Sequence, residues 1–266
     1  MKSLRLGAKI VSTIFRQSTY QLDWAIADAI SLAVRCGLLL ALYHYTFQVK
    51  GGTIAGQQYP VVAWSMFMYF IFMTLRLRNL DSLINQDIQS GNVEMFFNKP
   101  ISYLVYRMWY QIGAGSASVV ILAPLGIITM IAFVAAPAIL TTGFFWLTLP
   151  MVVLGCTILS LLIYAIIGLT AFWIEDSTPV HWIVDKLIMI LGGSYLPIAF
   201  FPPLMKSIAI YSPFGACQFI TSMTADSWNT DAWKLIGIQW AWILVLMVGM
   251  IVMYKQARLK LSVNGG

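Results

Sequence analysis

Six apolar segments, each long enough to cross a lipid bilayer, are separated by short polar stretches along the chain. Their bounds are 24–47, 59–77, 103–134, 144–173, 181–201 and 232–254. The hydrocarbon core of a bilayer is about 30 Å thick, so a crossing helix needs about 20 apolar residues. Lipid offers the backbone no hydrogen-bond partners, which favours helices. We therefore predict an all-α integral membrane protein with six transmembrane helices in a single transmembrane domain, 1–266.

The charge content supports a chain that is solvated mainly by lipid. Only 10% of its residues are charged, whereas soluble domains carry about 25%. The net charge of +6 does not indicate nucleic-acid binding, because the basic residues stand at the ends of apolar segments and form no single patch. The lipid bilayer is the expected surrounding, and nucleic acid is excluded as a partner.

The distribution of basic residues sets the expected orientation. With six spans, twelve of the sixteen Lys and Arg residues fall on one side of the membrane. Lys50, Lys206 and Lys234 fall on the other side, and Arg35 lies within the first span. Because Lys and Arg are enriched in cytoplasmic loops, this bias predicts a multi-pass protein with its N- and C-termini in the cytoplasm.

The segment 2–20 has an amphipathic pattern. Polar and basic residues recur at helical spacing from Lys2 to Arg16, and apolar residues lie on the other face. This pattern predicts an N-terminal helix that rests on the inner membrane surface. The alternative is an ordinary cytoplasmic helix packed on protein.

The inner loop 79–100 contains a second amphipathic pattern. Leu80, Ile84 and Ile88 recur at every fourth residue, which predicts a short cytoplasmic helix. Gly91 is a plausible C-terminal stop, and Pro100 separates the loop from the third span. Such a helix is either a docking element for a soluble partner or a cover for the inner end of the bundle.

Glycine and proline interrupt the chain around the end of the fifth span. The residues concerned are Gly192, Gly193, Pro197, Phe200, Phe201, Pro202 and Pro213. Non-helical backbone at membrane depth is tolerated where protein buries it or where it lines a cavity. We expect a re-entrant outer hairpin over 197–213, between spans five and six, acting as an outer gate. The alternative is a plain extracellular loop with a proline kink.

Two charges lie inside the first span. Asp28 and Arg35 are seven residues apart and therefore share one helix face. An arginine near the middle of a span needs a partner or a wet cavity. The pair is either a substrate-path or subunit-contact charge, or a structural ion pair.

The chain carries no common nucleotide or hydrolase motif. It has no Gly-x-x-x-x-Gly-Lys-Ser/Thr phosphate loop, no His-Glu-x-x-His and no Gly-x-Ser-x-Gly. His44 and His181 fall on opposite sides of the predicted membrane, so they form no metal site. We expect a protein that is not an enzyme and has no metal or cofactor of its own.

Two stretches resemble a known family. In the first, Gly91 precedes a Lys99–Pro100 pair at the start of the third span. The second, 185–214, joins an Asp-Lys pair to the Gly pair and the prolines of the hairpin. In this order they resemble bacterial ABC exporter permeases of type 2, in the branch of viologen and antibiotic exporters. The resemblance covers most of the chain.

The resemblance implies a permease subunit of the bacterial cytoplasmic (inner) membrane. Its implied partners are a second permease, identical or different, and a separately encoded ABC ATPase that binds ATP and Mg²⁺. The segment 2–20 would be the connecting helix, and the hairpin would be the outer gate. Coupling to the ATPase would fall to Leu80, Ile84, Ile88, Gly91, Lys99 and Pro100.

These expectations combine into one function with two alternatives. The predicted function is outward movement of an amphiphilic or cationic small molecule, or of lipid-like or peptide cargo, driven by ATP hydrolysis in the partner. A stand-alone secondary carrier is the first alternative. A membrane scaffold or assembly factor that transports nothing is the second.

Overall fold

The computed structural model describes residues 2–19, 22–93, 101–194 and 196–264 and confirms the all-α integral membrane class. Its α-helices are α1 (Lys2–Thr19), α2 (Leu22–Val49), α3 (Tyr59–Met73), α4 (Leu80–Gln89), α5 (Tyr103–Phe133), α6 (Gly143–Leu169), α7 (Ala171–Ile174), α8 (Thr178–Leu191), α9 (Pro203–Tyr211), α10 (Pro213–Ala216) and α11 (Trp228–Asn264). Short 3-10 helices are η1 (Leu77–Asn79), η3 (Ala138–Thr141), η4 (Ile198–Phe200) and η5 (Phe219–Thr224). Strands β1 (Thr53–Ile54) and β2 (Gln57–Gln58) pair antiparallel between α2 and α3.

Among the described residues, five helical segments are long and apolar enough to cross a membrane. They are Ala29–Val49, Tyr59–Gln89, Tyr103–Phe133, Gly143–Ile174 and Trp228–Lys260. They correspond to the predicted spans one, two, three, four and six.

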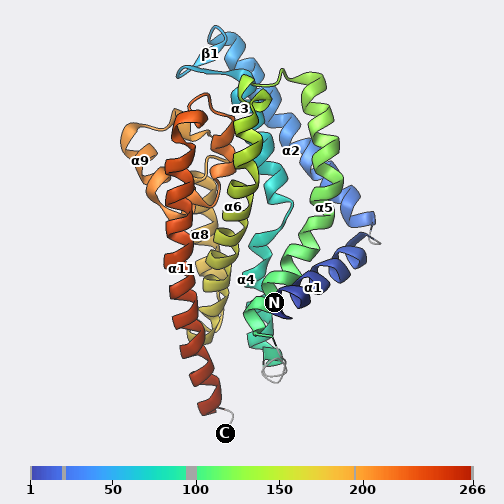
Figure 1. Cartoon of the computed structure of the whole chain (residues 1–266), viewed down its shortest axis with the longest axis vertical. Helices are drawn as coiled ribbons and strands as arrows, with labels where there is room; N and C mark the ends of the chain where they lie inside the picture. Colours follow the sequence, from blue (N-terminus) through green and yellow to red (C-terminus); the bar gives the residue numbers. More distant parts are fainter. Residues whose placement is uncertain (1, 20–21, 94–100, 195, 265–266) are drawn as a thin grey trace.

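The predicted fifth span, 181–201, is not a single helix. α8 has 14 residues, which gives it a length of about 21 Å, shorter than the roughly 30 Å of a bilayer core. The chain then bends at Gly192 and Gly193 and continues through η4 and α9. Figure 1 shows α8 below α9, so the two together rise through most of the bundle. The count of six crossings stays a prediction.

The bundle has two distinct ends. The α4 end lies in the lower half of Figure 1, together with α1 and the last turns of α11. The hairpin end lies in the upper half and holds α9 and the small β hairpin.

α6 is the central helix of the bundle. α11, α4 and η5 pack against it, and 72% of its apolar stretch is buried. The apolar stretch of α2 is only 6% buried, and those of α5 and α11 are 17% and 22% buried. These three helices therefore present most of their apolar side chains to lipid or to another subunit.

α1 packs along α5 through small residues. A Cβ atom at Gly7 would lie 2.5 Å from the Trp109 ring, and one at Gly113 would lie 3.0 Å from Cβ of Ile14. Small residues at such contacts let two helices approach closely. Arg5 and Arg16 stay exposed on α1. The helix predicted at 2–20 is therefore present, and one of its faces packs on protein.

The helix breaks between α3 and α4. α3 ends at Met73, and Arg76 has a left-handed backbone with φ of +52°, which is uncommon for a residue with a side chain. Gln111 of α5 donates a hydrogen bond from Nε2 to the Arg76 carbonyl oxygen over 2.8 Å. A Cβ atom at Gly115 would overlap the Leu75 backbone. Close contact with α5 thus stabilises the break.

Candidate functional site

The predicted inner helix is present as α4. It starts at Leu80 and ends at Gln89, as the spacing of the apolar residues indicates. Gly91 follows with φ of +71°, a conformation that favours glycine and ends helices. Lys99 and Pro100, which the resemblance also assigns to coupling, lie outside the described residues.

The apolar side of α4 packs into the bundle. Leu80 and Ile84 are fully buried, and Ile88 is partly buried against the same cluster. A Cβ atom at Gly168 of α6 would lie only 2.8 Å from Cβ of Ile84, so glycine permits this close approach. Leu80 and Ile84 therefore contact their own chain, where a soluble partner cannot reach them.

A buried ion pair joins α4 to α5. Arg107 of α5 donates from Nε and Nη2 to the two carboxylate oxygens of Asp87, over 2.6 and 2.5 Å. The Tyr103 hydroxyl donates a further bond to Asp87 Oδ2 over 2.5 Å. Asp87 is 6% exposed. Bidentate pairing of this kind fixes both position and orientation.

Two further contacts join η1 and α4 to α6 and α8. Nδ1 of His181, on α8, lies 2.8 Å from Oδ2 of Asp81. One turn further along α8, Asp185 accepts a hydrogen bond from the Tyr164 hydroxyl of α6 over 3.1 Å. Arg78 of η1 lies 3.7 Å from the same carboxylate. Asp81 and Asp185 are nearly fully buried, so each depends on these partners.

The link between α7 and α8 contacts the exposed edge of α4. Asn85 donates to Asp176 over 2.9 Å and accepts from the backbone N–H of Ser177 over 3.3 Å. Gln89 donates to the Glu175 carbonyl oxygen over 3.1 Å. The pKa of Asp176 is lowered because the Thr178 backbone and hydroxyl donate to its carboxylate, as does Asn85.

The two elements form one polar surface at the α4 end, which we call the coupling face. It consists of the exposed residues Ser82, Gln86, Gln89, Glu175 and Asp176. The apolar spacing of α4 predicted the helix that carries the first part of this face. The contribution of the α7–α8 link was not predicted, because it lies some 90 residues further along the chain.

The hairpin end contains the bend that the glycines and prolines predict. Gly193 has φ of +74°, and the Thr221 hydroxyl donates to the Gly192 carbonyl oxygen over 3.2 Å. Ser212 caps α10 by accepting from the Gly215 N–H over 3.1 Å. The predicted gate residues occupy different environments. Gly192, Gly193, Pro197 and Phe201 are buried, Phe200 and Pro213 are half-buried, and Pro202 is exposed.

Gln239 connects the hairpin to two long helices. This α11 residue is fully buried and donates from Nε2 to the Ala216 carbonyl oxygen of α10 over 2.9 Å. The same nitrogen lies 3.1 Å from the Cys156 sulfur of α6. Its Oε1 atom is buried without a hydrogen-bond partner among the described residues, so the contacts of the amide nitrogen are what tie the hairpin to α6 and α11.

The first-span charges are only partly described. Arg35 is exposed on α2, so its side chain points away from the rest of the chain. No carboxylate among the described side chains forms an ion pair with it. The Asp28 side chain lies outside the described part, so a pair between Asp28 and Arg35 stays a prediction.

Comparison with known families gives one match. The family model described as ABC-2 family transporter protein matches residues 32–265. This range contains α4, the coupling face and the whole hairpin. No curated protein matches the chain.

Proposed function

The chain belongs to the ABC-2 family of transporter proteins, and from this premise we propose that it is the permease subunit of an ATP-driven exporter in the bacterial cytoplasmic membrane. The coupling face carries the proposal. A separate ABC ATPase would dock there, with ATP and Mg²⁺ bound to the ATPase and the α4 end facing the cytoplasm.

Force at the coupling face would not move α4 alone. The Asp87–Arg107 pair joins α4 to α5, and the Asp81–His181 contact joins it to α8. Breaking a buried pair by removing one partner costs about 3–5 kcal/mol. Because separation is so unfavourable, α4, α5 and α8 would respond to the ATPase as one body.

The route to the hairpin follows from connectivity. α8 leads directly into the Gly192–Gly193 bend, and Gln239 joins the hairpin to α6 and α11. A displacement of α8 would therefore reach the hairpin, which would act as the outer gate. ATP drives such a cycle only if the two arrangements bind nucleotide with different affinity.

A second permease, identical or different, would complete the transport path. The support for it is the largely unburied apolar surface of α2 and α5 and the exposed Arg35 within the first span. The cargo would be an amphiphilic molecule moved outward.

The central test is cargo-stimulated ATP hydrolysis by the complex of chain and ATPase. Gln86→Trp places a bulky group in the middle of the coupling face and should lower hydrolysis about fivefold or more, given typical coupling energies. Gln58→Trp, at an exposed position of the hairpin end, is the matched control. Equal hydrolysis in both variants, with co-purification of the ATPase unchanged, would contradict the proposal.

The two alternatives give different results. A secondary carrier would transport in proteoliposomes with an ion gradient and without ATP. A scaffold would bind a partner and move no cargo under either condition.

A further inference from the structure

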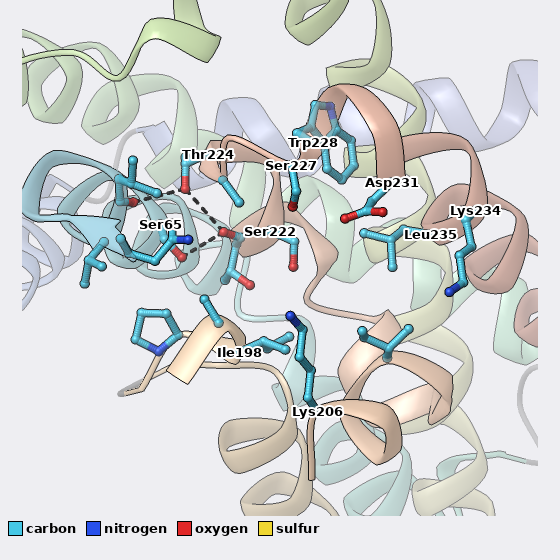
Figure 2. A pocket seen from close by; sticks show the side chains of 18 residues that line it. Ser65, Ile198, Lys206, Ser222, Thr224, Ser227, Trp228, Asp231, Lys234 and Leu235 are labelled. Carbon is cyan, nitrogen blue, oxygen red and sulfur yellow. Dashed lines mark hydrogen bonds between the residues drawn. The ribbon is translucent and has the colours of Figure 1, made fainter. Parts of the chain in front are cut away.

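A cavity of about 300 Å³ lies at the hairpin end, between the start of α3, the hairpin and the start of α11 (Figure 2). Pockets for small molecules measure about 300–1,000 Å³. This cavity is at the low end of that range, so it fits a head group better than a whole drug-sized molecule.

Three charged side chains line the cavity. Figure 2 shows Lys206 extending into it from α9, and Asp231 and Lys234 standing on the first turns of α11. Among the described side chains, no carboxylate is within ion-pair distance of Lys206. The Lys234 ammonium lies 5.3 Å from the centre of the Tyr211 ring. Two cations against one anion leave the cavity positive.

The start of α11 adds to this positive character. The helix begins at Trp228, and the N-terminus of a helix carries a partial positive charge. A hydrogen bond of 3.0 Å from the Trp228 indole to the buried Thr148 hydroxyl fixes this end. The serines Ser222 and Ser227 also line the cavity, and hydroxyl groups donate readily to phosphate oxygens.

Gln57 supplies an acceptor on another wall. Its Oε1 atom is buried and has no hydrogen-bond partner within the described part of the chain. A buried acceptor without a partner is costly. A ligand with a hydroxyl or amine beside its anionic group would satisfy it.

The depth of the cavity argues for an amphiphile. Ser65 lines it six residues after α3 begins, and Leu235 lines it seven residues after α11 begins. At 1.5 Å per residue, the cavity reaches about 10 Å from the helix ends. That depth spans the head-group layer and the edge of the hydrocarbon core. The deeper wall includes the apolar side chains of Val62 and Ile210.

We propose that this cavity binds the phosphate-bearing head group of an amphiphile, held by Lys206 and Lys234. The assignment deepens the proposed function by naming the class of cargo, and it rests on that function for the direction of movement. Two lysines disfavour the cationic cargo that the sequence left open.

The test is lipid retention by native mass spectrometry. The full-length chain, with its partner subunits, is released from bilayers that contain phosphatidylglycerol and phosphatidylcholine. The Lys206→Gln/Lys234→Gln double variant should retain about tenfold less phosphatidylglycerol, because charge-assisted bonds to phosphate are lost. Lys206→Arg/Lys234→Arg should retain it, and Lys255→Gln, at the other end of α11, should behave as wild type.

Two further measurements test which part of the lipid is bound and whether it binds in this cavity. Added inorganic phosphate that displaces the lipid would support a phosphate site, and an excess that leaves it bound would assign binding to the whole head group. Ser222→Phe fills the cavity without removing charge and should also lower retention. Equal retention in the double glutamine variant and wild type overturns the proposal. The assay uses no ATP, so its failure leaves the coupling test unaffected.

Discussion

Arg107 on α5 donates two hydrogen bonds to the carboxylate of Asp87 on α4, and both side chains are largely buried. Together with the Tyr103 hydroxyl, which also donates to Asp87, this pair fixes the relative orientation of the two helices at the α4 end.

Removing one partner of this pair should destabilise the protein. Asp87→Leu leaves the Arg107 guanidinium buried without its partner and should cost about 3–5 kcal/mol. Thermal unfolding in detergent, followed by fluorescence, measures the loss. The double variant Asp87→Leu/Arg107→Leu removes both charges and should recover much of the stability. A double variant as unstable as the single one would contradict a pairwise interaction.

The close packing of α4 on α6 should depend on the absence of a side chain at Gly168. Gly168→Val drives a side chain into Ile84, and overpacking of this kind costs about 1–3 kcal/mol. Cargo-stimulated ATP hydrolysis should fall because the coupling face is displaced. Gly249→Val is the matched control, since a Cβ atom at Gly249 meets nothing within 4 Å. Equal effects of the two valines would show that the α4–α6 contact is unimportant.

Acid should loosen the contact between α4 and the α7–α8 link. The folded-state pKa of Asp176 lies below its ordinary value of 3.8. The charged carboxylate therefore contributes stability above pH 3.8, and the contribution is lost as the pH falls through the lowered pKa. Protection factors of the link against hydrogen exchange, which are corrected for the intrinsic pH dependence of amide exchange, should fall at low pH in the wild type. Asp176→Asn should have lower protection factors already at pH 7 and should not show this further fall.

Arg35 should act at a contact between subunits. An arginine in the middle of a span costs about 2.5–3.5 kcal/mol in lipid, and a partner on another subunit would relieve that cost. Arg35→Leu should reduce co-purification of the second permease and leave the chain itself folded, as size-exclusion chromatography would show. Arg35→Lys keeps the charge and should retain part of the assembly. Wild-type assembly in the leucine variant would remove Arg35 from the interface.

The sequence predicted secondary-structure elements better than it predicted the tertiary contacts between them. Apolar spacing predicted the short helix that contains Leu80, Ile84 and Ile88, because an amphipathic helix repeats its apolar side chains every turn. The same spacing could not predict which residues elsewhere in the chain contact this helix. His181 contacts Asp81 across 100 residues, and only the fold brings them together.

At two places the structure adds what hydropathy and spacing could not predict. Hydropathy extended the predicted fifth span to residue 201, because it measures composition and does not detect the backbone turn at Gly193. The resemblance assigns the apolar residues of α4 to partner coupling, which stays a prediction, and the structure places Leu80 and Ile84 inside the chain. In a short amphipathic helix such as α4, the apolar side packs against the bundle and the polar side remains exposed.

The left-handed backbone at Arg76 separates the axis of α3 from that of α4. A continuous helix over 59–89 would transmit a push on α4 straight along its axis into the wall of the cavity. Because the axis is interrupted at Arg76, a push on α4 would instead pass sideways through Arg107 and His181. At the cavity, α3 is hydrogen-bonded to η5, because Ser65 donates to the Thr221 carbonyl oxygen over 2.7 Å and Thr224 donates to the Val61 carbonyl oxygen over 3.1 Å. The walls of the cavity that α3 and η5 supply would thus move together.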